Sequence, residues 1–335
     1  YVSINAWAAR GPNQPLEPYS YDPGPLAPDD VEIAVEACGL CHSDVSVMNN
    51  EWGISSYPVI PGHEVIGKIV ALGSNAKGLQ IGQRVGVGWG SASCMHCAQC
   101  LNGEGNLCAE NVPTIVGRFG GFADRVRAQW PWAVPLPDGL NPANAGPLLC
   151  GGVTVFTPLK VFDIRPTDRV GVVGIGGLGH LALQFAKAWG CEVTAFTSTD
   201  SKADEARGFG AHRVVNSRKA DEIKKIAGTL DLLLITVNVP LDWPAMLATL
   251  RPKGRLHFVG AVLEPIPINA FDIIMTQRSV SGSPNGSPIT TAQMLEFAAR
   301  HKILPQTEHF PIAKVNDAVK HLLDGKARYR VVLDM

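Results

Sequence analysis

The stretch RVGVVGIGGLGHLALQFAKAWG, at positions 169–190, indicates the fold of a large part of the chain. It reads as a buried strand, Arg169–Val173, followed by a glycine-rich turn and a helical pattern over Leu178–Trp189. The first glycine of such a turn makes it tight, the second admits a diphosphate, and the third allows close packing. The free N–H groups of the helix then favour the negative charge. We predict a dinucleotide site here rather than a plain strand-to-helix turn, formed by Gly174, Gly176, Gly177, Leu178 and Gly179.

Strand and helix patterns keep alternating after this turn. Alternation of this kind is typical of a parallel sheet with helices on both faces, the Rossmann type of α/β domain, which we place at residues 153–284. The expected strands are 192–196, 213–215, 230–236 and 255–259, and the expected helices are 202–209, 220–227 and 241–250.

The first part of the chain has a different pattern. Short strands separated by glycine are expected at 31–37, 65–72 and 84–87, which is typical of a compact β-rich domain. Two helices at 290–301 and 314–324 and a last strand at 329–333 are expected to return to it. The predicted first domain therefore comprises residues 1–152 and 285–335.

The tip of the second Rossmann strand indicates which dinucleotide binds. An acidic residue about 20 positions after the glycines would hold the ribose of NAD. Here the tip carries Thr197 and Ser198, and Lys202 follows. Hydroxyls with a cation accept a phosphate, which a carboxylate would repel, so this pattern favours NADP. The hydroxyls could also serve only to cap the next helix.

Four cysteines lie close together in a glycine-rich segment. Cys94, Cys97, Cys100 and Cys108 have the spacing C-x2-C-x2-C-x7-C. Four thiolates on one loop can enclose a structural zinc ion, and we predict such a lobe at residues 90–110. A disulfide cluster would suit a small secreted domain better, and iron–sulfur clusters usually have other spacings.

Several motifs in this order resemble the zinc-dependent medium-chain alcohol dehydrogenases, over essentially the whole chain. They are CHSD at 41–44, GHE at 62–64, the four-cysteine lobe, LLCGG at 148–152 and GIGGLG at 174–179. YPVIPGHE, PLLCGGVT and the closing RYRVVLDM are similar to the cinnamyl-alcohol-dehydrogenase-like branch of NADP-dependent aldehyde reductases. The resemblance implies a GroES-like catalytic domain, a Rossmann domain and an active site in the cleft between them.

The resemblance also unites residues that spacing alone cannot connect. Two thiolates and an imidazole with an open position form a catalytic zinc site, and the resemblance assigns Cys41, His63 and Cys150 to it. Asp44 is a candidate acceptor for the other nitrogen of His63. Further implied roles are a proton relay starting at Ser43, cofactor contacts, and transient approach to zinc by Glu64, which could equally be a buried ion-pair partner. The implied cofactor contacts are His42, Thr154, Val259 and Gly260.

The chain departs from the family pattern in two places. Many relatives end the relay at a His five positions after the first ligand, where this chain has Ser46, which is no comparable base near neutral pH. The segment 111–121 is shorter than usual, so the substrate entrance is expected to differ. Trp52, Trp89 and Phe119 are candidates for its apolar wall, although each could be ordinary core.

Composition limits the remaining function classes. Charged residues make up 18% of the chain and the net charge is -1, with no basic run, so we expect no nucleic-acid partner. Apolar stretches are interrupted well before the roughly 18 residues that a membrane span needs. No signal-like start is seen, and reduced metal-binding thiols suit the cytoplasm. The resemblance implies a homodimer formed by edge pairing of the Rossmann sheets, with a tetramer as the alternative.

The leading hypothesis is a zinc-dependent, NADP-preferring alcohol dehydrogenase working as an aldehyde reductase on aromatic or medium-chain aldehydes. It would hold two zinc ions in each chain. A polyol or secondary-alcohol dehydrogenase on the same scaffold is the enzyme alternative. A non-catalytic NADPH-binding protein is the other, favoured only by the absence of the relay His.

Overall fold

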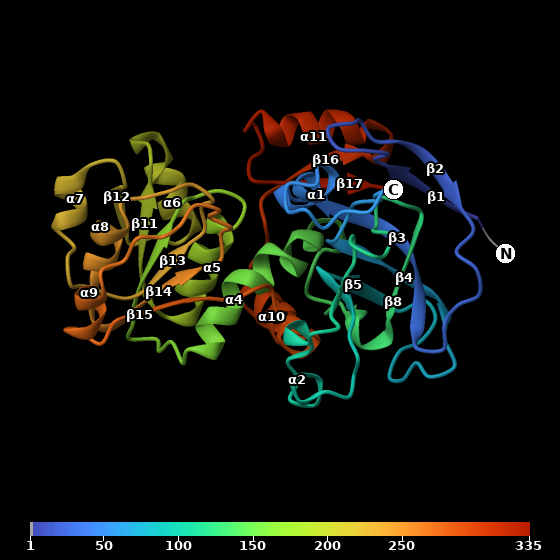
Figure 1. The fold of residues 1–335 in the computed structure, drawn as a ribbon, viewed down its shortest axis with the longest axis horizontal. Helices are drawn as coiled ribbons and strands as arrows, with labels where there is room; N and C mark the ends of the chain where they lie inside the picture. The colour runs from blue at the N-terminus through green and yellow to red at the C-terminus, as the bar shows by residue number, and fades with distance from the viewer. Residues whose placement is uncertain (1–2) are drawn as a thin grey trace. The chain divides into compact units, whose positions relative to one another are not determined.

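The computed structural model describes residues 3–335, which form two compact units (Figure 1). The first unit is the chain up to Val153 together with Asn285–Met335, and the second is Thr154–Pro284. None of the helices in this part of the chain is long and apolar enough to cross a bilayer.

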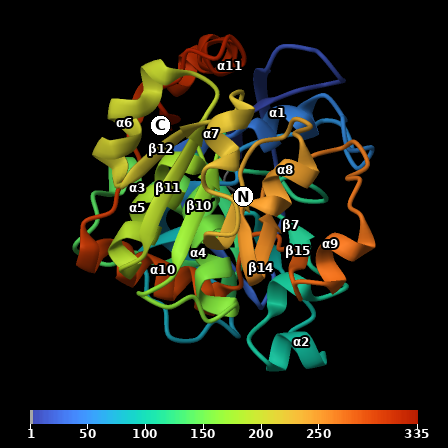
Figure 2. The same ribbon diagram turned by 90° about the vertical axis from the view of Figure 1, so that its left-hand side faces the viewer.

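The second unit is a six-stranded sheet in which every pairing is parallel, in the order β12-β11-β10-β13-β14-β15. Figure 2 shows these strands side by side. Helices α5 and α6 cover one face, while α7 and α8 cover the other (Figure 1). Its strands are β10 (Arg169–Val173), β11 (Glu192–Thr197), β12 (Arg213–Asn216), β13 (Leu230–Ile235), β14 (Leu250–Phe258) and β15 (Ser279–Gly282). Its helices are α5 (Gly179–Trp189), α6 (Ala203–Phe209), α7 (Ala220–Lys224), α8 (Trp243–Ala248) and α9 (Ala270–Ile274), and α4 (Gly151–Val161) leads into it.

These elements follow from the apolar pattern. The central strands are buried along nearly their whole length, as expected where helices cover both faces of a parallel sheet. Helix α5 ends at Gly190, whose φ of 105° suits glycine. The Rossmann type of sheet is confirmed.

The limits of several elements differ from the prediction. The helix expected over 220–227 ends at Lys224, and the strand expected over 255–259 is part of β14, which begins at Leu250. The pattern indicated a helix over 241–250, but α8 covers only Trp243–Ala248. The Asp242 side chain accepts a hydrogen bond from the N–H of Ala245 and so caps the helix two residues later than predicted. At the other end Leu250 already belongs to β14.

The first unit is built on a seven-stranded sheet in the order β16-β17-β3-β4-β5-β9, with β8 also paired to β3. Two small sheets, β1-β2 and β6-β7, complete it. Its strands are β1 (Ile4–Ala8), β2 (Glu17–Tyr21), β3 (Asp30–Leu40), β4 (Val65–Leu72), β5 (Arg84–Val87), β6 (Gly90–Ala92), β7 (Val112–Pro113), β8 (Arg125–Gln129), β9 (Val134–Pro135), β16 (Thr307–Pro311) and β17 (Arg330–Asp334). Its helices are α1 (His42–Met48), α2 (Ala98–Leu101), α3 (Pro142–Ala145), α10 (Pro288–His301) and α11 (Val315–Leu323). The β-rich character predicted for this part is confirmed.

The register of this sheet brings distant residues to one end of it. Strand β3 pairs antiparallel with β4, with Cys38 opposite Val65, and antiparallel with β17, with Leu40 opposite Val331. The residues just after β3, just before β4 and at the start of β17 therefore meet. The candidate site lies there.

Candidate active site

Three predicted ligands converge at this end of the sheet, all within the first unit. Cys41 directly follows β3, His63 precedes β4, and Cys150 follows a short 3-10 helix, Gly146–Leu149. One ligand atom from each of these three, and one from Glu64, all lie within 4.8 Å of one another. Such a set of thiols and an imidazole is the donor chemistry of a catalytic zinc ion, so the residues present fit that metal.

Asp44 orients the imidazole. Its Oδ1 accepts from Nδ1 of His63 at 2.8 Å and from the N–H of Gly62 at 2.8 Å, while Oδ2 accepts from the N–H of Cys41 at 2.9 Å. This leaves Nε2 of His63 directed to Sγ of Cys150, 3.3 Å away. A carboxylate behind a ligand His fixes the tautomer that a metal requires. The expected contact between Asp44 and His63 is present.

Arg330 is a member of the site that the sequence did not reveal. It is buried and forms an ion pair with Oε1 of Glu64, which is completely buried. Oε2 of Glu64 has no hydrogen-bond partner among the described residues. Of the two roles considered for Glu64, the ion pair is therefore present. Only the register of β17 brings Arg330 here, since it lies 266 positions after Glu64.

The protonation of the cluster follows from its charges. The Cys150 thiol beside it, His63 and Arg330 hold the pKa of Cys41 well below its usual value, against the effect of burial. Burial lowers the pKa of His63, but the Asp44 carboxylate outweighs it and holds that pKa well above the ordinary value. Burial raises the pKa of Glu64 to about 7, although Arg330 opposes this. The cluster therefore favours a thiolate at Cys41, the form that binds a metal.

Two serines flank this cluster in different ways. The hydroxyl of Ser43 lies 3.8 Å from Sγ of Cys41. Ser46 is in the last turns of α1, and its hydroxyl donates to Oε2 of Glu51 at 2.7 Å. The structure thus places Ser43 at the metal ligands and gives the hydroxyl of Ser46 a carboxylate partner near the surface.

Of the three predicted aromatic residues, one contacts a predicted metal ligand and a second packs on the first. The Trp89 ring packs edge-on against His63 with centroids 5.1 Å apart, and Trp52 packs against Trp89 at 5.9 Å. Phe119 instead packs on Tyr21, 4.7 Å away, and on Tyr19, beside the main core of the unit. The structure brings Trp52 and Trp89 together but does not join Phe119 to them.

The four cysteines of the lobe also form a compact group. Their sulfur atoms lie within 4.8 Å of one another, and those of Cys94 and Cys100 are 3.9 Å apart. The peptide N–H groups of Cys97, Cys100 and Glu110 point at the sulfurs of Cys94, Cys97 and Cys108, at 3.3–3.5 Å. All four are free thiols. Four sulfurs in a closed group fit a structural zinc ion.

The glycine-rich loop of the second unit has room for a diphosphate. A Cβ at Gly179 would lie 1.8 Å from the carbonyl oxygen of Gly174, and Gly174 itself has a φ of +92°. A Cβ at Gly176 would meet no atom within 4 Å. Gly174 and Gly179 are therefore required by the backbone, whereas Gly176 leaves open space beside the chain, which is where a diphosphate would approach. Gly177 and Leu178 complete the loop.

The ends of β11 and β14 lie at the same edge of the sheet as the glycine-rich loop. Thr197 is buried and its hydroxyl donates to the carbonyl of Thr199 at 2.6 Å, while Ser198 is exposed. Lys202 donates to the carbonyl of Ile175 in the glycine-rich loop at 3.3 Å. Val259 and Gly260 follow β14 at this edge as well. Because the Thr197 hydroxyl is already donated, Ser198 and Lys202 are the better phosphate candidates.

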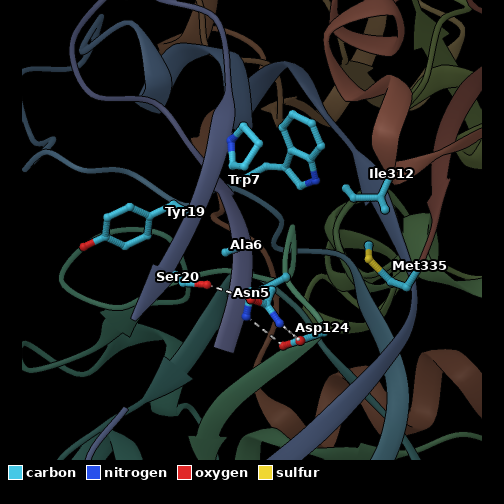
Figure 3. A pocket seen from close by; sticks show the side chains of 10 residues that line it. Asn5, Ala6, Trp7, Tyr19, Ser20, Asp124, Ile312 and Met335 are labelled. Atoms are coloured by element: carbon cyan, nitrogen blue, oxygen red, sulfur yellow. Dashed lines mark hydrogen bonds between the residues drawn. The ribbon is translucent and has the colours of Figure 1, made fainter. Parts of the chain in front are cut away.

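Two other predicted cofactor residues lie on helices. Thr154 is buried in α4, and His42 is exposed at the first position of α1. A cavity of about 470 Å³ in the first unit, between β1, β2 and the C-terminus, includes Trp7, Tyr19 and Met335 (Figure 3). It contains none of the predicted ligands and carries none of the site's chemistry.

Comparison with known proteins gives a consistent result. The family model for the alcohol dehydrogenase GroES-like domain matches residues 27–138, and the model for zinc-binding dehydrogenases matches residues 177–300. The chain is 53% identical to the aldehyde reductase AdhA of Synechocystis sp. over 98% of both proteins. The structure of a cinnamyl alcohol dehydrogenase from Sorghum bicolor superposes with a TM-score of 0.95 at 38% identity, covering 99% of this chain and 98% of that one. CAD from Helicobacter pylori, complexed with NADP(H), gives 0.91 at 29% identity, covering 100% of this chain and 98% of that one.

Proposed function

Because the chain belongs to the zinc-type alcohol dehydrogenases and aldehyde reductases, a family of oxidoreductases, we propose that it is an NADPH-dependent reductase of aromatic or medium-chain aldehydes. The observation that carries this proposal is the convergence of Cys41, His63 and Cys150, with Asp44 bonded behind the imidazole. These three residues would hold the catalytic zinc, and the four cysteines of the lobe would hold a structural one.

The zinc ion and the nicotinamide cofactor would supply chemistry that no side chain of the protein can provide. Zinc offers a Lewis acid for a carbonyl oxygen, and the nicotinamide offers a hydride. The chain itself holds and orients them. Asp44 accepts the hydrogen bond from Nδ1 of His63, so that Nε2 is the nitrogen that would bind the metal, and the thiolate of Cys41 would offset the metal's charge.

Other residues act on the substrate. The Ser43 hydroxyl, 3.8 Å from Sγ of Cys41, would hydrogen-bond to the aldehyde oxygen and deliver its proton. Trp89 packs edge-on against the imidazole and Trp52 packs on Trp89, and this apolar surface would exclude water from the reacting carbon. An apolar wall of this kind suits an aromatic or aliphatic aldehyde better than a polyol.

The cofactor preference rests on the strand tip. The tip carries no unpaired carboxylate, and it presents Ser198 and Lys202, as expected for an enzyme that accepts the 2′-phosphate of NADP. The similar protein from Helicobacter pylori is complexed with NADP(H), which supports the same choice here. In this proposal the second unit is the coenzyme-binding domain, with the contributions of His42 and Thr154 still to be tested.

The assembly and its location are also proposals. Strand β15 is an edge strand of the parallel sheet, and an unpaired edge can pair with a second copy. Nearby, Phe271, Ile274 and Met275 on and after α9 are 69%, 64% and 74% exposed, an apolar surface that a homodimer would cover. The reduced metal-binding thiols are consistent with the cytoplasm.

The test is the initial rate of reduction of benzaldehyde and cinnamaldehyde with NADPH and with NADH, on protein of measured zinc content. The proposal predicts two zinc ions per chain and faster turnover with NADPH. Cys150→Ser should lose one zinc ion and turnover, while Cys191→Ser, a buried cysteine of the second unit, should keep both. Tight NADPH binding without turnover of any aldehyde would favour the non-catalytic alternative, and turnover of polyols with NADH would favour the polyol enzyme.

A further inference from the structure

The tip of β12 carries a cation next to the predicted phosphate site. β11 and β12 are parallel neighbours, and Thr197 pairs with Asn216 in the register. The N–H and the hydroxyl of Ser217 both donate to the carbonyl of Thr197, at 2.7 and 3.0 Å. By the same register Ser198 is level with Ser217, and Arg218 is the next residue along, on strands that lie about 4.8 Å apart.

The guanidinium of Arg218 is available for a ligand. The residue is exposed, and within residues 3–335 no protein group forms a hydrogen bond or an ion pair with its side chain. Only its backbone is held, because the Arg218 N–H donates to Oδ1 of Asn216 at 3.0 Å. Because only the backbone of Arg218 is held, its guanidinium is able to reach the tip of β11.

The neighbouring carboxylates are already occupied. Asp200 accepts from Nδ2 of Asn216 at 2.9 Å and from Nζ of Lys219 at 3.1 Å. Glu222 accepts from the N–H of Asn216 at 2.8 Å and pairs with Lys219 at 3.3 Å. These contacts lower the pKa of Asp200 and Glu222, and both carboxylates are bonded to Lys219 and Asn216. Asp200 and Glu222 therefore already have partners other than Arg218.

We infer that Arg218 binds the 2′-phosphate of the adenosine end of the cofactor and is a specificity determinant for NADPH over NADH. The inference rests on the proposed function and adds a residue to it. A guanidinium offers a planar fork of N–H donors that matches a phosphate, and it retains its charge at any working pH. Lys202 bonds to the glycine-rich loop, so the two cations would reach the phosphate from two different strand tips.

The experiment measures binding alone, by calorimetry on the full-length zinc-loaded protein. The probes are 2′,5′-ADP and 5′-AMP, which differ only in the 2′-phosphate. We expect wild type to bind 2′,5′-ADP more tightly than 5′-AMP. Arg218→Ala should bind 2′,5′-ADP about tenfold more weakly, the effect of losing a charge-assisted hydrogen bond at an exposed site, and 5′-AMP unchanged. Arg218→Lys should be intermediate, because it keeps the charge but not the fork.

Arg213→Ala is the matched control. Arg213 is an exposed arginine at the opposite end of the same strand, so its removal should leave both affinities as in wild type. An Arg218→Ala protein that retains its 2′,5′-ADP affinity within twofold, while wild type still prefers that probe, would overturn the inference and leave the NADPH proposal standing. Equal weakening for both probes would also overturn it, as a structural effect. A wild type that does not prefer 2′,5′-ADP would reject the NADPH proposal itself.

Discussion

Replacing Asp44 by Asn tests how the metal ligands are oriented. The carboxylate is buried and accepts three hydrogen bonds, from the N–H groups of Cys41 and Gly62 and from Nδ1 of His63. The amide of Asn has one acceptor oxygen. If that oxygen serves Gly62 and His63, the NH₂ group faces the N–H of Cys41, and two donors meet.

The expected magnitude follows from this count. Loss of one buried hydrogen bond to a charged acceptor costs about 1.5–3 kcal/mol of unfolding free energy. The bond to His63 also becomes weaker because its acceptor is neutral, and changes of this kind typically lower metal affinity by about 10- to 100-fold. Asp44→Asn should therefore unfold at lower denaturant concentration and bind one of its two zinc ions about 10- to 100-fold more weakly, while the lobe keeps the other.

The assay is zinc competition with a chelator, combined with denaturant unfolding of the same samples. Glu51→Gln is the matched control, because it also removes one carboxylate charge, from an exposed residue just after α1 that accepts a hydrogen bond from Ser46. It should be close to wild type in both measurements. If Asp44→Asn holds both zinc ions with wild-type affinity and unfolds at the wild-type midpoint, the reasoning about the buried carboxylate is refuted.

Three further predictions concern other parts of the molecule. Cys97→Ser should release one zinc ion and lower the melting temperature more than it lowers turnover per folded molecule; an unchanged melting temperature with lost turnover would contradict a structural lobe. Glu32→Gln should destabilise the protein by about 2 kcal/mol near pH 7, because two arginines lose a largely buried acceptor. Burial raises the pKa of Glu32, but those arginines outweigh burial and lower that pKa below its ordinary 4.5. The difference in stability between wild type and Glu32→Gln, measured by urea unfolding, should therefore persist above pH 4.5 and shrink as the pH falls through the lowered pKa. A difference independent of pH would argue against the ion pairs of Glu32 with the two arginines. Gly179→Ala should lower the melting temperature by its clash with Gly174, whereas Gly176→Ala should melt like wild type and weaken NADPH binding in a fluorescence titration; the opposite pattern would contradict the assignment of the loop.

Much of the fold and of the family membership could be predicted from residues that are close together in the sequence. The strand, turn and helix around Gly174 are local, and the three glycines are needed for steric reasons that act over a few residues. The four cysteines of the lobe lie within 15 positions, so one loop can bring them together. Alternating apolar patterns likewise predicted the parallel sheet, although the ends of α8 depended on a cap at Asp242 that the pattern did not reveal.

The predicted metal site could not be found from local sequence in this way, because its residues are far apart along the chain. Cys41, His63 and Cys150 could be joined before the structure only by resemblance to a family, since no spacing rule connects them. Arg330 was missed altogether. Its position depends on the antiparallel register between β17 and β3, which places the start of one strand beside the end of the other.

The sequence by itself therefore determined the features set by local sterics and by the period of apolar residues, namely the dinucleotide loop, the cysteine lobe and the two kinds of sheet. Only the tertiary structure decided which side chains face each other across strands. It packed Phe119 on Tyr19 and Tyr21 rather than on Trp89, and it brought Arg330 to Glu64. Strand register controls those contacts, and register depends on the packing of the whole sheet.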